Sequence, residues 1–161
     1  MSRQIHHSFV LRFSKPRSTP VQPVTADELY QVEQGLKVTF PAAYVAFLTE
    51  YGPIFTPSVL DLVTGGESEQ APKGAGPDVR KFFTPQEISE THRLYTTGGM
   101  EAWVVPFATD SMGNLFGFKR EELEPRPDDC PVLFFDHDFC KIRQQAAAFD
   151  TWLASYLELA K

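Results

Sequence analysis

The order of hydrophobic patterns along the chain constrains its fold more than any single motif. Apolar residues recur with helical spacing over much of 25–98 and again at 149–157, whereas strand-like runs cluster between 103 and 135. A doubly wound parallel fold needs strands and helices in alternation. We therefore expect a single α+β domain, in which a central, mainly antiparallel sheet is flanked by an N-terminal helix pair and a C-terminal helix.

Four helices can be placed from their start signals and apolar stripes. Thr25–Glu28 and Thr84–Glu87 are capping boxes, in which a threonine hydroxyl and a glutamate three residues later bind free backbone amides. The first box opens a helix that we expect to stop near Gly35, and the second opens a helix that ends at 98–99. Another helix is expected at Pro41, because proline is common at the first helical position. The C-terminal helix has an apolar stripe made of Phe149, Trp152, Leu153, Tyr156 and Leu157.

Strand-like patterns occur in the middle of the chain and in two further segments. Residues 103–108 and 115–118 flank a turn that contains glycine, which predicts a β-hairpin, and 132–135 is expected to add another strand. Apolar and polar residues also alternate over 5–13 and 59–63, so we expect strands there as well.

Proline and glycine indicate how the chain is divided. Prolines at three positions make 14–24 an extended linker, and the glycine-rich segment 65–77 is predicted to be a mobile loop. We expect residues 1–24 to form a strand-like extension with a proline-rich linker, and residues 25–161 to form the α+β domain. His7 would lie half-buried on the apolar face of the first strand.

Charge and cysteine content narrow the classes of function. The chain has 15 basic and 21 acidic residues, and because four basic and no acidic residues lie within 1–23, the rest of the chain is strongly acidic. An acidic body repels nucleic acid and anionic membranes and favours a basic partner, although solubility alone also explains such a charge. Cys130 and Cys140 are too few for a disulfide scaffold, but pairing between them stays open. No apolar run is long enough for a signal peptide or a membrane span, so we expect a cytoplasmic protein.

The common phosphate-binding, dinucleotide-binding, esterase and metalloprotease motifs are absent from the sequence. Asp136-His137-Asp138, with Cys140 close by, could bind a metal or act as a base, but aspartates after an apolar strand more often cap a turn. The run 121–129 is either a solvated loop or a landing site for a basic partner. We expect no catalytic residue, metal or cofactor, and the candidate partner-binding residues are Asp110, Asn114, Glu121, Glu122, Asp128, Asp129, Asp136, His137 and Asp138.

Four segments in a fixed order resemble the SUKH superfamily. Residues 33–52 resemble its turn-and-helix signature, 105–118 its hairpin, 132–137 its following strand and 148–153 its closing helix. The likeness extends over about residues 25–158. Asn114 stands where the family often has aspartate, Pro53 stands where a second glycine is common, and the first 24 residues have no counterpart in the signature.

The resemblance implies a protein-binding module without catalytic activity. The superfamily includes a fungal regulator of cell-wall synthesis and many bacterial immunity proteins encoded beside polymorphic toxins, often nucleases. It therefore implies an immunity protein that neutralises a cognate toxin domain, often a nuclease, by stoichiometric binding. From the acidic body we expect that this domain is basic and that neither nucleic acid nor a membrane is a partner. The alternatives are a regulatory scaffold of the fungal type and a metal-dependent hydrolase built on Asp136, His137, Asp138 and Asp110.

Overall fold

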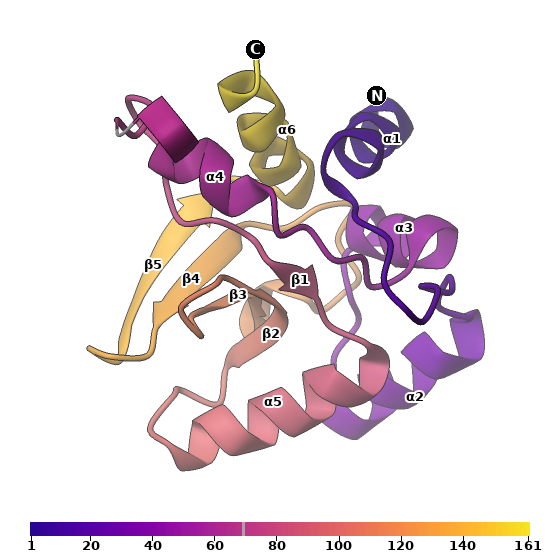
Figure 1. Cartoon of the computed structure of the whole chain (residues 1–161). Helices are drawn as coiled ribbons and strands as arrows, with labels where there is room; N and C mark the ends of the chain where they lie inside the picture. Colours follow the sequence, from indigo (N-terminus) through magenta and orange to yellow (C-terminus); the bar gives the residue numbers. More distant parts are fainter. Residues whose placement is uncertain (69) are drawn as a thin grey trace.

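The computed structural model describes residues 1–68 and 70–161 and shows an α+β domain in which helices flank a five-stranded sheet (Figure 1). Within the described residues, the helices are α1 (Ser2–Phe13), α2 (Ala26–Leu36), α3 (Ala42–Tyr51), α4 (Val59–Thr64), α5 (Pro85–Thr97) and α6 (Phe149–Leu159), with short 3-10 turns at Gly66–Ser68 and Arg120–Glu122. The strands are β1 (Lys81–Phe82), β2 (Val104–Thr109), β3 (Leu115–Lys119), β4 (Val132–Asp136) and β5 (Lys141–Ala146).

The sheet is an antiparallel meander with the strand order β1-β2-β3-β4-β5. The hairpin expected from the sequence is present as β2 and β3, with an irregularity in the register between Pro106 and Ala108. Strand β4 also forms as predicted. Strand β5 was not predicted, because its sequence KIRQQA lacks an alternating apolar face.

Aromatic side chains fill the space between the sheet and the helices on one of its sides. Helices α1, α4 and α6 lie on that side, whereas α5 lies on the other (Figure 1). The Phe107 and Phe118 rings stack with their centroids 4.5 Å apart, and Trp152 of α6 lies 4.7 Å from Phe116. All four side chains are buried. This aromatic layer fixes α6 across the sheet.

Both predicted capping boxes are confirmed. The Glu28 amide donates to Thr25 Oγ1 at 3.2 Å, and the Thr25 amide donates to Glu28 Oε2 at 2.8 Å. Thr84 and Glu87 make the same reciprocal pair at the start of α5. The predicted stop at Gly35 is wrong: α2 runs to Leu36, and Lys37 takes the left-handed conformation with φ 57°.

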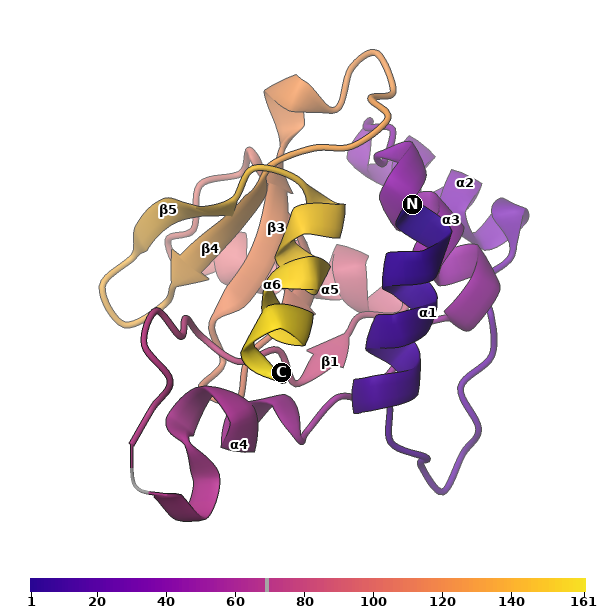
Figure 2. The ribbon, with the colours of Figure 1, turned by 90° about the horizontal axis from the view of Figure 1, so that it is seen from above.

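The prediction of a strand over residues 5–13 is also wrong, because this segment is helix α1. The helix turns His6, Phe9 and Phe13 into the protein and leaves His7 exposed, so the half-buried position expected for His7 is not found. Helices α1 and α6 run side by side (Figure 2). Ile5, Phe9 and Phe13 belong to the alternating pattern and are also four residues apart, so the same residues fit one face of a helix. Contact with α6 favours the helix over the strand.

Residues 59–63, predicted as a strand, form helix α4 instead, with Val59 and Val63 buried one turn apart. The mobility predicted for 65–77 stays a prediction, and residue 69 of that segment lies outside the described residues. No helix in the described parts of the chain combines the length and apolar character that crossing a bilayer requires.

Candidate partner-binding surfaces

The predicted partner-binding residues fall into two groups at opposite ends of the sheet. Because β3 and β4 are antiparallel and Leu115 pairs with Phe135, the start of β3 lies beside the end of β4. We call the group at this end the turn cluster: Asp110, Asn114, Asp136, His137 and Asp138. The group at the other end is the acidic loop, residues 120–129, which contains Glu121, Glu122, Asp128 and Asp129.

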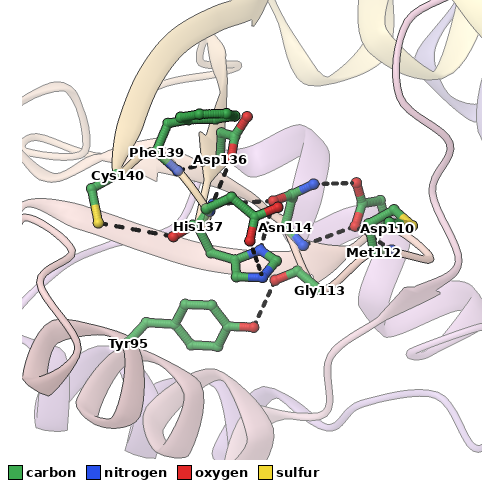
Figure 3. Close-up of polar contacts among 10 residues, drawn as sticks. Tyr95, Asp110, Met112, Gly113, Asn114, Asp136, His137, Phe139 and Cys140 are labelled. Carbon is green, nitrogen blue, oxygen red and sulfur yellow. Dashed lines mark hydrogen bonds and ion pairs between the residues drawn. The ribbon is translucent and has the colours of Figure 1, made fainter.

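Asp110 holds the β2–β3 turn together (Figure 3). Its side chain is 5% exposed, and its Oδ1 accepts hydrogen bonds from the Met112 amide at 2.9 Å and the Asn114 amide at 2.8 Å. Gly113 in this turn has φ 84°, a conformation that favours glycine, and its carbonyl accepts from the Tyr95 hydroxyl at 2.7 Å. The Asp110 carboxylate is therefore committed to the turn.

Asn114 connects the two turns of the cluster. Its Nδ2 donates to Asp110 Oδ2 at 2.9 Å, and its Oδ1 accepts from the His137 amide at 3.0 Å. The same Oδ1 lies 2.8 Å from His137 Nδ1, so that ring nitrogen carries a proton. An ionised aspartate at this position could not donate to Asp110, which gives the departure from the family signature a physical role.

The segment Asp136-His137-Asp138 forms the turn between β4 and β5. Asp136 Oδ1 accepts from the Asp138 amide at 3.0 Å, which is the turn-capping arrangement. His137 Nε2 lies 3.3 Å from Asp138 Oδ1, whereas the Cys140 thiol lies 3.9 Å from the His137 carbonyl oxygen. The imidazole nitrogens thus face Asn114 and Asp138. In the described chain, no three His, Cys, Asp or Glu side chains are grouped to hold a metal ion.

The two arginines of the acidic loop bind groups of a neighbouring part of the domain. Arg126 Nη1 donates to the Phe40 carbonyl at 2.6 Å, and its Nη2 lies 2.9 Å from Oε1 of the buried Glu33. Arg120 donates to the Leu36 carbonyl. Both guanidinium groups are therefore paired with groups of α2 and of the segment that follows it, while the Arg126 side chain stays 39% exposed.

Backbone contacts also hold the acidic loop in place. The Ala42 amide donates to the Pro127 carbonyl and the Ala43 amide donates to the Asp128 carbonyl, each at 2.9 Å, so the loop caps the start of α3. The Leu123 side chain is fully buried. The loop is therefore anchored along its length rather than free in solvent.

Asp129 differs from the other acidic residues of the loop. Its Oδ1 accepts from the Phe149 amide at 2.7 Å and its Oδ2 accepts from the Asp150 amide at 3.2 Å, so its carboxylate caps α6. The exposed acidic residues of the loop are Glu121, Glu122, Glu124 and Asp128. Glu121 lies 3.5 Å from Lys119 Nζ.

The cysteines sit in different environments and are both free. Burial, together with the nearby Glu122 carboxylate, raises the pKa of the Cys130 thiol to about 12. Cys130 is therefore protonated at neutral pH and inert as a nucleophile. Cys140 is exposed, at the end of the β4–β5 turn.

Two important acidic residues were not identified from the sequence. Glu33 is buried on α2 and accepts from the Phe40 amide at 2.8 Å as well as from Arg126. Asp78 is 4% exposed, and its Oδ1 accepts from the Ser111 hydroxyl at 3.0 Å. Burial raises the pKa of Asp78, and the charge of Asp110 adds to this effect. No local motif marks either residue, because their partners lie far away in the sequence.

A family comparison covers most of the chain. The model of the SMI1 / KNR4 family (SUKH-1) matches residues 23–155, a span that includes the turn cluster and the acidic loop and excludes α1. No curated protein sequence gives a significant match. The matched span contains all five strands of the described sheet, and the four signature segments follow one another within it in the predicted order. The chain therefore belongs to the SMI1 / KNR4 family (SUKH-1).

Proposed function

We propose that this protein is an immunity protein that binds a basic toxin domain stoichiometrically and blocks it without catalysis of its own. Family membership supports a role of this kind. The observation that carries the proposal is the different pairing of the charges in the acidic loop: Arg120 and Arg126 bind carbonyl and carboxylate groups of the domain, whereas Glu121, Glu122, Glu124 and Asp128 are exposed.

The acidic loop suits a nuclease as the target. A nuclease binds its substrate through cations that neutralise phosphates, and a group of carboxylates can occupy the same cations. Complementary charge also speeds the encounter of two proteins. The loop is already held by the carbonyls of Pro127 and Asp128 and by the buried Leu123, so little ordering is needed when it binds.

The test uses the product of the gene immediately upstream as the candidate toxin. We expect it to co-purify with the full chain at a fixed ratio and co-expression to protect cells from it. A triple variant, Glu121→Gln with Glu122→Gln and Asp128→Asn, should lower the association rate about tenfold at low salt and less at high salt. The matched control neutralises three exposed acids elsewhere, Asp61, Glu90 and Glu101.

The outcomes separate the alternatives. Absence of binding and of protection would refute the immunity function. Equal rate losses in the two triple variants would show that net charge, rather than the acidic loop, drives the encounter. Repeated recovery of an endogenous regulator, and never of a toxin, would identify a regulatory scaffold instead.

A further inference from the structure

We propose that a pocket between the C-terminal turn of α5 and the β4–β5 turn receives an arginine or lysine side chain of the partner. The inference rests on the proposed function in one respect, namely that the partner is a basic protein. The pocket adjoins the turn cluster and not the acidic loop, so it is a separate contact region at the other end of the sheet.

The pocket has apolar walls and an open mouth. Its volume is about 290 Å³, and its lining residues are Leu94, Tyr95, Gly98, Phe135, His137 and Cys140. The Tyr95 and Phe135 rings form its aromatic wall, with their centroids 6.3 Å apart in an edge-on arrangement. Leu94 is 63% exposed at the edge of the pocket.

The rim of the pocket is negative. Helix α5 ends here with no basic residue in its last turn, so no cation of the helix offsets the negative end of its dipole. The Leu94, Tyr95 and Thr96 carbonyls of this turn accept from the amides of Gly98, Met100 and Gly99. Asp138, with its side chain 69% exposed, stands beside the lining residue His137. Lys141 Nζ lies 6.0 Å from the Phe139 ring centroid, and Figure 3 shows Phe139 directed away from Tyr95.

Apolar walls under a negative rim match a long cationic side chain. Its methylene stem can pack against Leu94 and Phe135, while its charged head stays at the rim near Asp138 and the α5 carbonyls. The faces of Tyr95 and Phe135 add a cation–π attraction that a neutral side chain lacks. An aliphatic side chain would leave the rim unused, and a carboxylate would be repelled.

The first experiment needs no toxin. The full chain is titrated with N-acetylarginine methylamide and, as the uncharged analogue of equal shape, N-acetylcitrulline methylamide, while backbone amide signals are followed by NMR. We expect the arginine probe to shift the amides of Gly98, His137 and Cys140 saturably and the citrulline probe to bind several-fold more weakly. Equal shifts from both probes, or shifts spread over the surface, would overturn the inference.

Two variants test the geometry and the charge separately. Gly98→Leu should abolish the shifts by filling the pocket, since Gly98 has φ −83° and a new Cβ would come no nearer than 3.5 Å to its neighbours. Gly35→Leu is the matched control, on a helix position with no atom within 4 Å. Asp138→Asn should weaken the arginine probe and leave the citrulline probe unchanged. Persistence of full arginine binding in both Gly98→Leu and Asp138→Asn would contradict the pocket.

Binding of the upstream toxin domain then separates the two proposals. We expect Gly98→Leu to weaken the complex about tenfold and Gly35→Leu to leave it unchanged. If the toxin binds both variants like the parent chain, the pocket is not a contact, and the immunity function stands. If no toxin binds while the arginine probe still occupies the pocket, the immunity function falls and the cation site stands.

Discussion

Replacing Phe9 by alanine tests whether the N-terminal segment is part of the core. Phe9 lies on α1, outside the span that matches the family, and yet its side chain is 0% exposed. Its ring centroid lies 5.1 Å from Phe13, 6.1 Å from both Phe82 and Tyr156, and 6.5 Å from Phe47. The side chain therefore joins α1 to α3, to β1 and to α6.

The expected loss of stability follows from this burial. Removing a fully buried phenylalanine side chain costs about 3–5 kcal/mol, through lost transfer energy and the cavity left behind. A domain of this size unfolds in urea with a slope of about 2 kcal/mol per molar. A loss of about 3.5 kcal/mol then lowers the urea midpoint by about 1.7 M at an unchanged slope.

Equilibrium urea unfolding, followed by far-UV circular dichroism and by the fluorescence of the buried Trp152, measures this shift. The matched control is Leu11→Ala on the same helix, because Leu11 is 77% exposed and its replacement should change stability by less than about 0.5 kcal/mol. A midpoint for Phe9→Ala within 0.3 M of the parent, or equal losses in both variants, would refute the packing of α1 described above.

Three further predictions concern single residues. Asp129→Ala should lower stability by about 1–2 kcal/mol, because it removes the carboxylate that caps α6. The control is Asp128→Ala, which should change stability little because the Asp128 side chain is exposed. Equal urea midpoints for the two variants would count against the cap. Gly35→Ala should add about 0.5–1 kcal/mol in the same assay, since Gly35 lies inside α2 with free space around it, and a loss would contradict this. Burial raises the pKa of Asp78 in the folded chain, so ionisation of Asp78 lowers stability as the pH rises from the unfolded pKa through the folded one. The stability of Asp78→Asn relative to the parent chain should therefore increase between pH 4 and pH 7. A stability difference that does not change with pH would exclude this linkage.

Local signals predicted the starts of α2 and α5 and the hairpin correctly. The capping boxes at Thr25 and Thr84 act within four residues, and the turn at Asp110 closes on itself through Asn114. Each of these structures is decided by neighbours in the sequence. The α+β class follows from their order.

The same kind of reasoning failed where one sequence pattern fits two structures. Residues 5–13 and 59–63 alternate like strands and also repeat like helices, and local spacing does not choose between them. Strand β5 has no apolar alternation and exists because its backbone pairs with β4. In these segments, packing and pairing with distant elements override the local pattern.

The candidate surfaces show the same division. The acidic character of 121–129 and the turn at 136–138 can be recognised in the sequence, but the direction of each charge cannot. Arg126 pairs with Glu33, 93 residues away, and the pocket beside α5 forms because Tyr95 of α5 contacts Phe135 of β4.

The sequence by itself determined the starts of α2 and α5, the hairpin, the closing helix and the negative charge of the body, because these depend on composition or on residues a few positions apart. The tertiary structure decided that the N-terminal segment is a helix, since His6 meets Asp150, 144 residues away, and Phe9 enters the core. It also decided which charges are paired, because the carbonyl and carboxylate partners of Arg120 and Arg126 come from distant parts of the chain that only folding brings together.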